Sequence, residues 1–506
     1  MTAKILSQLL PAVGGARLVR GDADTLVMGI GYDTRRLSPG DLFVAVPGFR
    51  VNGLAHVPQA LGGGACAVVA EEEPAPATTG STPIVLVPSA RAALAELSGA
   101  FYDHPSRRLD VVGVTGTDGK TTITHLLSAV LEAAGRRTGW LTTVSTKIAA
   151  QQRPNAVDHT TPEAPVVQGT LAEMVAAGVD VAIVETSSHA LALGRVAGTR
   201  FRVGVFSNLS PEHLNFHGSL AAYREAKSRL FAMLPPDGLA VLNADDPSSD
   251  AMRAASRARV VSYGFAAAAD VRAADVVLGA RGTTFHLVAA DAGTGSLIQT
   301  QLVGRFNVAN WLAAYAAAAF FGATPDDVRR AAALQRPVPG RMTLVDHGQP
   351  FPVVVDFAHT PQALEKALDT VRELVPGRVL LVFGLAGGRD FHNRGVMGAL
   401  AARLSDYVVI TMDDPGDEDP GAIARQIASG AEAAGAREGD HFAIQLDRRA
   451  AIREVLARAR PTDVVLLAGK GHENRMVVAG GRLPWNDAAV AGDALGRLGF
   501  SPHPVP

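Results

Sequence analysis

Short apolar runs alternate with helical patterns along most of the chain. In the first hundred residues, the runs DLFVAV, ACAVVA and PIVLV are separated by Gly and Pro, and an Ala/Leu helix pattern follows from Arg91 to Tyr102. Apolar runs of this length, bounded by turn residues, are typical of buried strands. The pattern predicts a small N-terminal α/β domain at residues 1–105.

A second region begins at Arg107. The run LDVVGVTG enters a Gly/Thr loop and then the helical stretch THLLSAVLEAAG, and the runs VDVAIVE, FRVGVFSN and GLAVLNAD follow at intervals filled by helical segments. Strands that alternate with helices in this way form parallel sheets. We therefore predict a central domain with a parallel sheet at residues 106–338, and the Gly/Thr loop between its first strand and helix makes it a candidate P-loop ATPase domain.

The Pro- and Gly-rich segment VPGRMTLVD marks a third region. Its strand candidates FPVVVDFA, RVLLVFG, DYVVITMD and DVVLLAGKG alternate with helical segments such as TPQALEKALDTVRELV and RRAAIREVLARAR. This alternation predicts a C-terminal Rossmann-like, doubly wound domain at residues 339–506, whose ligands would bind beyond the carboxyl ends of the strands. The expected fold class is α/β with three domains.

Composition narrows the range of functions. The 506 residues include 47 Lys plus Arg and 49 Asp plus Glu, so the net charge of −2 gives no field that would gather nucleic acid or an anionic membrane. Cys66 is the only cysteine, which excludes a disulfide and favours a small buried side chain. With no signal pattern and no apolar run of about 18 residues, we expect a cytoplasmic protein with small-molecule substrates. Nothing in the sequence requires association, so a monomer is expected.

The strongest local motif is VVGVTGTDGKTT, residues 111–122. A strand that leads through Gly116 and Gly119 into a helix presents backbone N–H groups to phosphates. Lys120 would neutralise the terminal phosphates, and Thr121 would offer its hydroxyl to Mg²⁺. The generic phosphate loop has Gly where this chain has Val114, so an ordinary Gly-rich turn is the alternative. The expected nucleotide-binding loop residues are Thr115, Gly116, Thr117, Asp118, Gly119, Lys120, Thr121 and Thr122.

Two later segments carry candidate metal ligands. Glu185 ends the run VDVAIVE, where a carboxylate facing the loop is placed to bind the Mg²⁺ of a nucleotide. The segment FSNLSPEHLNFHGSLAAYREAKSRLF places His213 and His217 in a polar loop before a helix that contains Lys227. Two histidines could bind zinc, but no third ligand of the usual spacing accompanies them. Without its motif, Lys227 would be interpreted as an exposed helical lysine.

These motifs resemble those of the Mur ligase family. TGTDGKTT is similar to its phosphate loop TGTNGKTT, and residues 206–231 are similar to its pattern NLxxDHLDxHGxxxxYxxAKxxLF, with Glu212 and Asn215 in place of two Asp. The resemblance implies an ATP-dependent ligase in which a substrate carboxylate becomes an acyl phosphate that an amine attacks. It also implies that Lys227 is carbamylated and supports a second Mg²⁺. The implied catalytic residues are Lys120, Lys227, His213 and Glu185, and the implied metal ligands are Thr121, Glu185, His213 and Lys227.

Other motifs resemble the substrate-binding motifs of MurE-type members. The segments NADDP, GRFNVANWLAA, PVPGRMTLVD and VVVDFAHTPQAL imply nucleotide contacts from Asn243, Asn307, Arg341, Asp356 and His359. For Asn307, a helix cap is the alternative. The segment YDTRRLSPGDLFVAVPGFRVNG resembles the uridine-binding pattern, and HTTPE resembles a TTP motif that contacts the UDP-muramoyl substrate. The implied substrate residues are Thr34, Phe49, Arg50, Val51, Thr160, Thr161, Ser187 and Arg195.

The C-terminal motifs bear on the incoming amino acid. VFGLAGGRD and LLAGKGHE extend the resemblance over nearly the whole chain and, with DDPG, imply amino-acid contacts from Arg389, Asp413, Asp414, Gly469 and Glu473. Members that add diaminopimelate typically read DNPR in place of DDPG, and that arginine clamps the distal carboxylate. Gly416 lacks the clamp and Asp414 adds a carboxylate, which favours lysine or ornithine unless Arg389 or Arg394 substitutes.

The resemblance therefore implies that a diamino acid is added to UDP-N-acetylmuramoyl-L-alanyl-D-glutamate, with ATP and Mg²⁺, in peptidoglycan precursor synthesis. Three other ligases remain open: the diaminopimelate-adding enzyme, a MurE-like ligase with a different acyl substrate, and a folylpolyglutamate-synthetase-like ligase. His159, Leu193 and the segment ENRMV favour the second, whereas the third would lack the uridine motif and KGHE. A regulatory protein without catalysis is disfavoured because Lys120 and Lys227 are retained.

Overall fold

The computed structural model describes residues 3–48, 51–75, 79–155, 160–279, 282–289, 295–388 and 391–501. The chain divides into two compact units, a first unit of Met1–Tyr263 with Ala313–Ala323 and a second unit of Gly264–Leu312 with Thr324–Pro506. Both units are mixed α/β, as the sequence predicts. None of the helices in the described residues has the length and apolar character needed to cross a membrane. The predicted boundaries at residues 105 and 338 remain predictions.

The N-terminal part of the first unit is a small sheet with helices on both faces. Its strand order is β2 (Arg17–Arg20), β7 (Ile84–Leu86), β6 (Ala67–Ala70), β5 (Asp41–Val44) and β4 (Gly29–Gly31), parallel except for the pair β2 and β7. Alternate side chains enter different cores, since Leu42 packs on one face and Phe43 on the other. The surrounding elements are β1 (Lys4–Ile5), α1 (Leu6–Leu9), η1 (Leu10–Ala12), β3 (Leu26–Val27), η2 (Gly53–His56), α2 (Val57–Gly62) and α4 (Ala90–Phe101).

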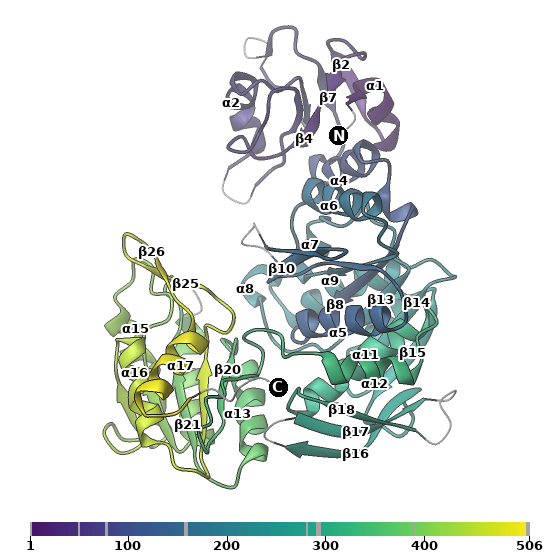
Figure 1. Ribbon diagram of the computed structural model, residues 1–506. Helices are drawn as coiled ribbons and strands as arrows, with labels where there is room; N and C mark the ends of the chain where they lie inside the picture. The colour runs from purple at the N-terminus through teal and green to yellow at the C-terminus, as the bar shows by residue number, and fades with distance from the viewer. Residues whose placement is uncertain are drawn as a thin grey trace. The chain divides into compact units, whose positions relative to one another are not determined.

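The rest of the first unit is built on a largely parallel sheet. The strand order is β11 (Gln151–Pro154), β10 (Ser145–Ile148), β9 (Thr138–Leu141), β12 (Val181–Glu185), β8 (Asp110–Thr115), β13 (Val203–Phe206), β14 (Leu239–Asn243) and β15 (Arg259–Gly264). The strands from β9 to β15 are parallel. The helices are η3 (Pro105–Arg107), α5 (Lys120–Ala133), α6 (Ala164–Ala176), α7 (Ser188–Ala192), α8 (Leu214–His217), α9 (Leu220–Ala232) and α10 (Ser249–Ala255). Helix α4 packs against α6 within this unit (Figure 1).

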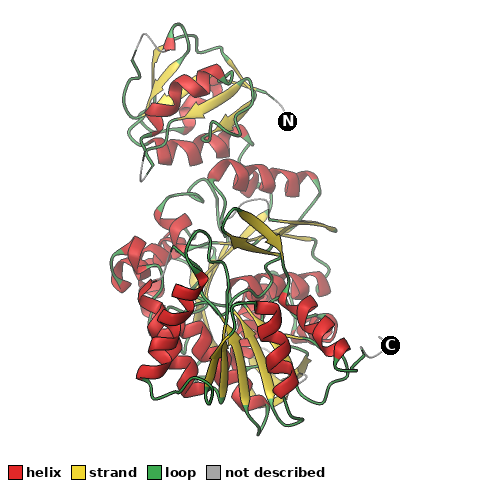
Figure 2. Cartoon of the chain, turned by 90° about the vertical axis from the view of Figure 1, so that its left-hand side faces the viewer, coloured by secondary structure: helices red, strands yellow, loops and turns green. Residues whose placement is uncertain are grey.

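The second unit contains the doubly wound sheet that the sequence predicts. Its strand order is β19 (Thr343–Leu344), β20 (Val353–Asp356), β24 (Val464–Ala468), β21 (Val379–Phe383), β22 (Tyr407–Ile410) and β23 (Phe442–Ile444), parallel from β20 onward. Helices α13 (Pro361–Leu374), α14 (Phe391–Leu404) and α15 (Pro420–Ala433) cover one face, and α16 (Arg448–Arg458) and α17 (Asp487–Arg497) cover the other (Figure 2). The carboxyl ends of these strands carry the candidate ligand-binding residues.

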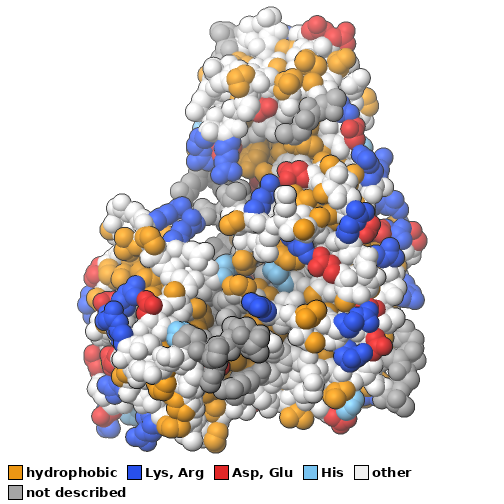
Figure 3. Space-filling view, viewed as in Figure 1, with side chains coloured by type: hydrophobic (Ala, Val, Ile, Leu, Met, Phe, Trp, Pro, Cys, Tyr) orange, Lys and Arg blue, Asp and Glu red, His pale blue; other side chains and the backbone are white. Residues whose placement is uncertain are grey.

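The second unit also contains strands that the sequence did not predict. Strands β16 (Val271–Gly279), β17 (Gly282–Ala289) and β18 (Ser296–Thr300) form an antiparallel arrangement, and β25 (Arg475–Val478) pairs with β26 (Gly481–Pro484) as a hairpin. Strand β17 alternates buried and partly exposed positions, which is the period-two signal of a half-buried strand. The remaining helices are α12 (Pro325–Leu334), which lies in this unit, and α11 (Arg305–Ala319), whose residues from Ala313 onward belong to the first unit. On the face shown in Figure 3, basic and acidic side chains both occur, in agreement with the small net charge.

Candidate active site

The loop between β8 and α5 has the backbone geometry of a phosphate-binding turn. Gly116 has a φ of 151°, and a Cβ added there would lie 1.8 Å from the Ser207 hydroxyl oxygen. Gly119, with a φ of 83°, immediately precedes the first turn of α5. The first N–H groups of a helix have no partner in a preceding turn, so they are available to anions. The loop therefore fits the phosphates of a nucleotide.

Residues at the ends of neighbouring strands hold this loop in place. The Thr117 N–H donates to the Asn208 carbonyl at 2.8 Å, and the Asp118 N–H donates to the Asn208 side-chain oxygen at 3.1 Å. The Ser207 hydroxyl donates to the Asp118 carbonyl at 2.5 Å. Asn243 donates its side-chain amide to the Ser207 carbonyl at 2.7 Å. Asn243 thus supports the loop from behind, and its predicted contact with the adenine base stays a prediction.

Two lysines meet at the carbonyl of Gly116. Lys120 donates to it at 3.0 Å and to the Thr117 carbonyl at 2.7 Å, and Lys227 donates to it at 2.7 Å. Lys227 is buried in α9, with its amine 4.4 Å from the centroid of the Tyr223 ring. Burial, and then the charge of Lys120, hold the pKa of Lys227 well below its ordinary value. A lysine in this setting holds its amine in the uncharged, nucleophilic form more readily than an exposed lysine does.

Glu185 lies beside the loop at the carboxyl end of β12. Strand β12 pairs in parallel with β8, with Glu185 opposite Val114. The Glu185 carboxylate is fully buried and accepts hydrogen bonds from the Thr143 hydroxyl at 2.9 Å and the Thr143 N–H at 3.3 Å. Because β12 and β8 are neighbours in the sheet, the carboxylate of Glu185 lies next to the phosphate loop. Thr115, Thr121 and Thr122 are buried around the same loop.

A group of histidines lies near Lys227 in the same unit. His213 has a φ of 56° and precedes α8, and its ring centroid is 4.6 Å from that of His189. Burial and then His213 lower the pKa of His189 to about 4. His217 contacts the Ser188 hydroxyl at 3.0 Å. Within the described part of this unit, no three His, Cys, Asp or Glu side chains converge as metal ligands. The metal set of Thr121, Glu185, His213 and Lys227 stays a prediction.

The residues predicted to contact the acyl substrate gather at Thr161. Its hydroxyl donates to the Glu185 carbonyl at 2.7 Å and accepts from the Ser187 N–H at 3.0 Å. Arg195 donates to the Thr161 carbonyl at 3.0 Å and forms an ion pair with Glu163 at 2.8 Å. Glu163 was not predicted as a site residue, although it belongs to the motif HTTPE. Thr161, Ser187 and Arg195 therefore lie next to Glu185.

The remaining residues of the predicted substrate set lie elsewhere or are not described. The Thr34 hydroxyl donates to the Gln59 side chain at 2.9 Å, Val51 is exposed, and Thr160 is half-buried. Phe49 and Arg50 lie outside the described residues. Their roles in substrate binding stay predictions.

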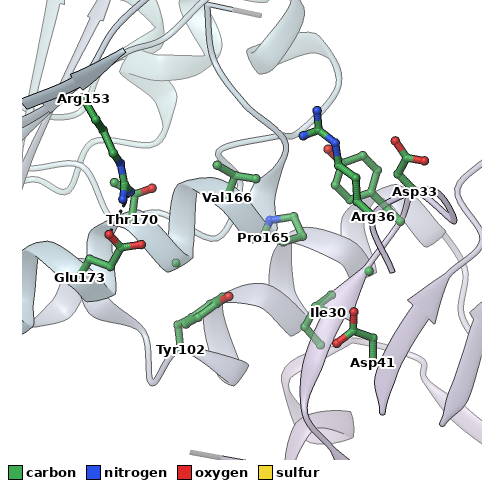
Figure 4. Close-up of a pocket in the computed structure, with 13 residues that line it drawn as sticks. Ile30, Asp33, Arg36, Asp41, Tyr102, Arg153, Pro165, Val166, Thr170 and Glu173 are labelled. Carbon is green, nitrogen blue, oxygen red and sulfur yellow. Dashed lines mark hydrogen bonds and ion pairs between the residues drawn. The ribbon is translucent and has the colours of Figure 1, made fainter. Parts of the chain in front are cut away.

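A cavity of about 300 Å³ lies between the N-terminal sheet and α6 (Figure 4). Tyr32, Arg36 and Tyr102 line it from one side, and Arg153 and Glu173, which form an ion pair at 2.9 Å, line it from the other. Burial is the main cause that raises the pKa of both tyrosines, so their hydroxyls remain protonated. None of the described residues that were predicted to contact the substrate lines this cavity. The sequence signal was membership of the motif, since Tyr32, Arg36 and Asp41 lie inside the segment YDTRRLSPGDLFVAVPGFRVNG.

In the second unit, the predicted nucleotide-side residues gather at the carboxyl end of β20. The Asp356 carboxylate accepts from the Met342 N–H at 2.7 Å, and His359 contacts the Phe357 carbonyl at 2.8 Å. Arg341 lies 4.9 Å from the centroid of the Phe357 ring. These contacts bring Arg341, Asp356 and His359 together.

Asn307 is engaged within its own helix. It donates to the Val303 carbonyl at 2.8 Å and accepts from Asn310 at 3.0 Å. The nitrogen and the oxygen of its side-chain amide are therefore both bonded at the start of α11. Its predicted contact with the nucleotide stays a prediction.

The predicted amino-acid residues surround Lys470, which lies in the motif LLAGKGHE at the carboxyl end of a predicted strand but was not itself predicted to contact the amino acid. The fully buried Lys470 ammonium lies 2.7 Å from Asp414, 2.6 Å from Glu473 and 3.6 Å from Asp413. Burial raises the pKa of Asp413 to about 6. Gly469 has a φ of 108°, and a Cβ there would lie 2.4 Å from an Asp413 carboxylate oxygen. We call Asp413, Asp414, Lys470 and Glu473 the Lys470 cluster; it holds three carboxylates and one ammonium.

The positions that would clamp a distal carboxylate are differently arranged. Gly416 has a φ of 58°, and a Cβ there would meet no atom within 4 Å. Arg394 is buried and donates to both carboxylate oxygens of Glu418 at 2.6 and 2.8 Å. The guanidinium of Arg394 is therefore already engaged. Arg389 lies outside the described residues. The carboxylate of Asp414 is paired with Lys470, so its charge is not free in the way that the sequence alone suggested.

Family models match most of the chain. The model of the Mur ligase family catalytic domain matches residues 26–102, that of the Mur ligase middle domain matches residues 114–318, and that of the Mur ligase glutamate ligase domain matches residues 340–471. Their order agrees with the order of the three regions predicted from the sequence.

Curated relatives and solved structures agree with these matches. The chain is 45% identical over 496 residues to the UDP-N-acetylmuramyl-tripeptide synthetase of Roseiflexus sp. (strain RS-1), covering 94% of this chain and 95% of the relative. It is 41% identical over 496 residues to the UDP-N-acetylmuramoyl-L-alanyl-D-glutamate–2,6-diaminopimelate ligase of Geobacillus thermodenitrificans, covering 97% and 99%. A solved structure of a ligase with the same description has a TM-score of 0.69 and 29% identity, covering 99% of this chain and all of that one. Mycobacterium tuberculosis folylpolyglutamate synthase, at 19% identity and a TM-score of 0.60 over 82% of this chain and 96% of its own, shares the fold alone.

Proposed function

Since the chain belongs to the Mur ligase family, we propose that it joins a diamino acid to UDP-N-acetylmuramoyl-L-alanyl-D-glutamate. It is an ATP-dependent amide-bond-forming ligase of the MurE type, which acts in peptidoglycan precursor synthesis. The observation that carries the substrate proposal is the contact of Thr161 with Glu185 and Ser187 beside the phosphate loop. This contact supports the proposal because it joins a residue proposed to contact the acyl substrate to residues proposed to handle phosphate.

Different residues of the first unit have different roles in the proposed phosphoryl transfer. Lys120 supplies positive charge to the terminal phosphates, and the N–H groups at the start of α5 orient them. Arg195, held by Glu163 and the Thr161 carbonyl, is fixed to receive an anionic group of the acyl substrate. The fit of the loop to phosphate rests on Gly116, whose Cβ position is filled by Ser207.

We propose that the residues around Lys227 hold a divalent cation once Lys227 is carbamylated, since an added carboxylate would complete a set of oxygen and nitrogen ligands. Thr121, Glu185, His213 and a carbamylated Lys227 would hold Mg²⁺, which would offset the charge that builds up on the acyl phosphate. The burial and lowered pKa of Lys227 support carbamylation, because only an uncharged amine attacks carbon dioxide.

For the incoming amino acid we favour lysine or ornithine. Gly416 brings no positive charge to a distal carboxylate, and Arg394 is engaged by Glu418. The Lys470 cluster has three carboxylates for one ammonium, so it attracts a further cationic group. Diaminopimelate is the second candidate, because relatives that are 37 to 41% identical are named as 2,6-diaminopimelate ligases.

Phosphate release by the purified protein tests the function and the choice of amino acid together. The assay contains ATP, UDP-muramoyl dipeptide and one of lysine, ornithine or meso-diaminopimelate. We expect release to require both the dipeptide and the amino acid, with lysine or ornithine preferred. Preference for diaminopimelate would contradict the choice of amino acid but leave the ligase assignment intact.

A variant tests the missing clamp directly. Gly416→Arg places a guanidinium where open space surrounds the Cβ position, so diaminopimelate should become a better substrate relative to lysine. The matched control is Gly435→Arg, which also has a positive φ and open space but follows the carboxyl end of α15. Equal effects of the two variants would show that Gly416 does not face the distal group. The cytoplasmic location and monomeric state remain predictions.

A further inference from the structure

A buried ion pair joins the two helices on one face of the second unit's sheet. Arg448 is the first residue of α16, and Asp487 is the first residue of α17. Arg448 Nε and Nη2 donate to the two carboxylate oxygens of Asp487 at 2.8 and 2.6 Å. Both side chains are fully buried. This arrangement is bidentate and uses one edge of the guanidinium fork.

The same guanidinium also holds the ends of two strands. Arg448 Nη2 donates to the Ala468 carbonyl at 2.9 Å, and Nη1 donates to the Met412 carbonyl at 3.4 Å. Ala468 is followed by Gly469 and Lys470, and Met412 is followed by Asp413 and Asp414. One arginine therefore ties together the starting points of both segments that carry the Lys470 cluster.

The segment that carries Lys470 is also tied in at its far end, through Asp487. The Trp485 indole N–H donates to an Asp487 carboxylate oxygen at 2.8 Å, and the Trp485 backbone N–H donates to the Asn474 carbonyl at 2.9 Å. Asn474 directly follows Glu473, the remaining member of the Lys470 cluster. The ion pair and its partners thus contact the segment 413–414 and both ends of the segment 470–473, which together carry the cluster.

We propose that Arg448 and Asp487 are positioning residues for the amino-acid step, because they fix the two segments that carry the Lys470 cluster. This inference rests on the proposed function of that cluster. A fully buried ion pair is weak support for stability, since apolar residues of similar size often serve as well. The pair's distinctive property is directional: one rigid fork reaches a carboxylate and two carbonyls at the same time.

Arg448→Lys tests the directional role while it keeps the charge. A lysine ammonium cannot reproduce the fork that contacts Asp487, Ala468 and Met412 together. We expect the KM for the amino acid to rise about tenfold, the effect of losing one charge-assisted hydrogen bond. The KM values for ATP and for UDP-muramoyl dipeptide should change less than about twofold. The control is Arg449→Lys, because Arg449 pairs with Asp493 across the same two helices at 3.9 Å on the surface.

A pH profile separates positioning from general structural support. Burial raises the pKa of Asp413, Arg448 and Lys470 lower it, and Asp414 and Glu473 raise it. Removing the Arg448 charge in Arg448→Met should therefore shift the acid limb of kcat/KM for the amino acid to higher pH. Arg448→Lys keeps the charge and should leave that limb in place. A purely structural role would change the two profiles alike.

A milder variant covers the case in which Arg448→Met does not fold. Trp485→Phe removes only the indole donor to Asp487, and a smaller rise in the KM for the amino acid is expected. The inference is overturned if Arg448→Lys matches Arg449→Lys, or if it raises all three KM values equally. Failure of the proposed function is seen separately, because the unaltered protein would then release no phosphate with the dipeptide and any diamino acid.

Discussion

Replacing Asp413 by Asn should make the protein more stable at neutral pH. Asp413 is 7% exposed and is packed against Gly469, whose missing Cβ makes room for the carboxylate. Burial is the largest influence on this group and raises its pKa from 3.8 to about 6, despite the opposing charges of Arg448 and Lys470. The ionised form is therefore disfavoured in the folded chain, and a neutral amide of the same shape removes that penalty.

The size of the effect follows from the shift. A pKa difference of about 2 units, at about 1.4 kcal/mol each, sets an upper limit of about 3 kcal/mol on the gain in the free energy of unfolding. An acid whose pKa is raised in the folded chain does not lower the stability below the unfolded pKa of 3.8, because it is protonated in both states. The loss of stability grows as the pH rises toward 6 and is complete above that pH. Asp413→Asn should thus stabilise at pH 7 to 8 and have no effect near pH 4.

Melting temperatures between pH 4 and pH 8 provide the assay. A change of 1 kcal/mol in the free energy of unfolding shifts the melting temperature of a unit of this size by roughly 2 to 4 °C. The melting temperature at pH 8 should therefore rise by up to roughly 10 °C. The control is Asp440→Asn, since Asp440 forms an exposed ion pair with Arg437 that is worth about 1 kcal/mol or less. A lower melting temperature for Asp413→Asn at pH 8, or a gain that does not depend on pH, would refute the reasoning.

Three further substitutions address the rest of the site. Lys120→Ala should reduce phosphate release below detection, because it removes the positive charge that would neutralise the terminal phosphates. Retained turnover would contradict the loop assignment. Lys227→Ala should lose activity and regain part of it with added short carboxylates that replace a carbamate, and absence of any recovery would count against that modification. Gly469→Ala should raise the KM for the amino acid more than the control Gly480→Ala, because both strain a positive φ but only the first collides with Asp413; equal KM values would place Gly469 outside the site.

Much of the fold was predictable because buried strands leave a strong local signal. The runs that end at Thr115, Glu185 and Asp356 are continuous and apolar, and parallel pairing of β8 with β12 brings Thr115 and Glu185 to the same edge of the first unit's sheet. The antiparallel strands β16 to β18 were missed, although the alternating burial of β17 reflects a period-two pattern in its sequence. Their polar, partly exposed residues do not stand out as apolar runs.

The site was less predictable where its parts come from distant segments. The motif LLAGKGHE placed Lys470 beyond the carboxyl end of a strand, but its pairing with Asp413, Asp414 and Glu473 could not be foreseen from the sequence. The inference that Asp414 adds a free charge failed to foresee this pairing, because residues 414 and 470 are brought together only by strands β22 and β24. Lys227 would be judged exposed from its helix alone, yet packing of α9 under the phosphate loop buries it.

The hydroxyl of Thr161 limits how the proposed acyl site of this enzyme can be redesigned. A single oxygen atom donates to the Glu185 backbone and accepts from the Ser187 backbone, so it joins the end of β12 to the start of α7. Exchange of this threonine for valine would keep the volume but sever both links at once. Under the proposed acyl-substrate role of Thr161, selection for a new acyl group at this position would therefore also disturb Glu185 and its strand, and neighbouring side chains are the better targets for mutagenesis libraries.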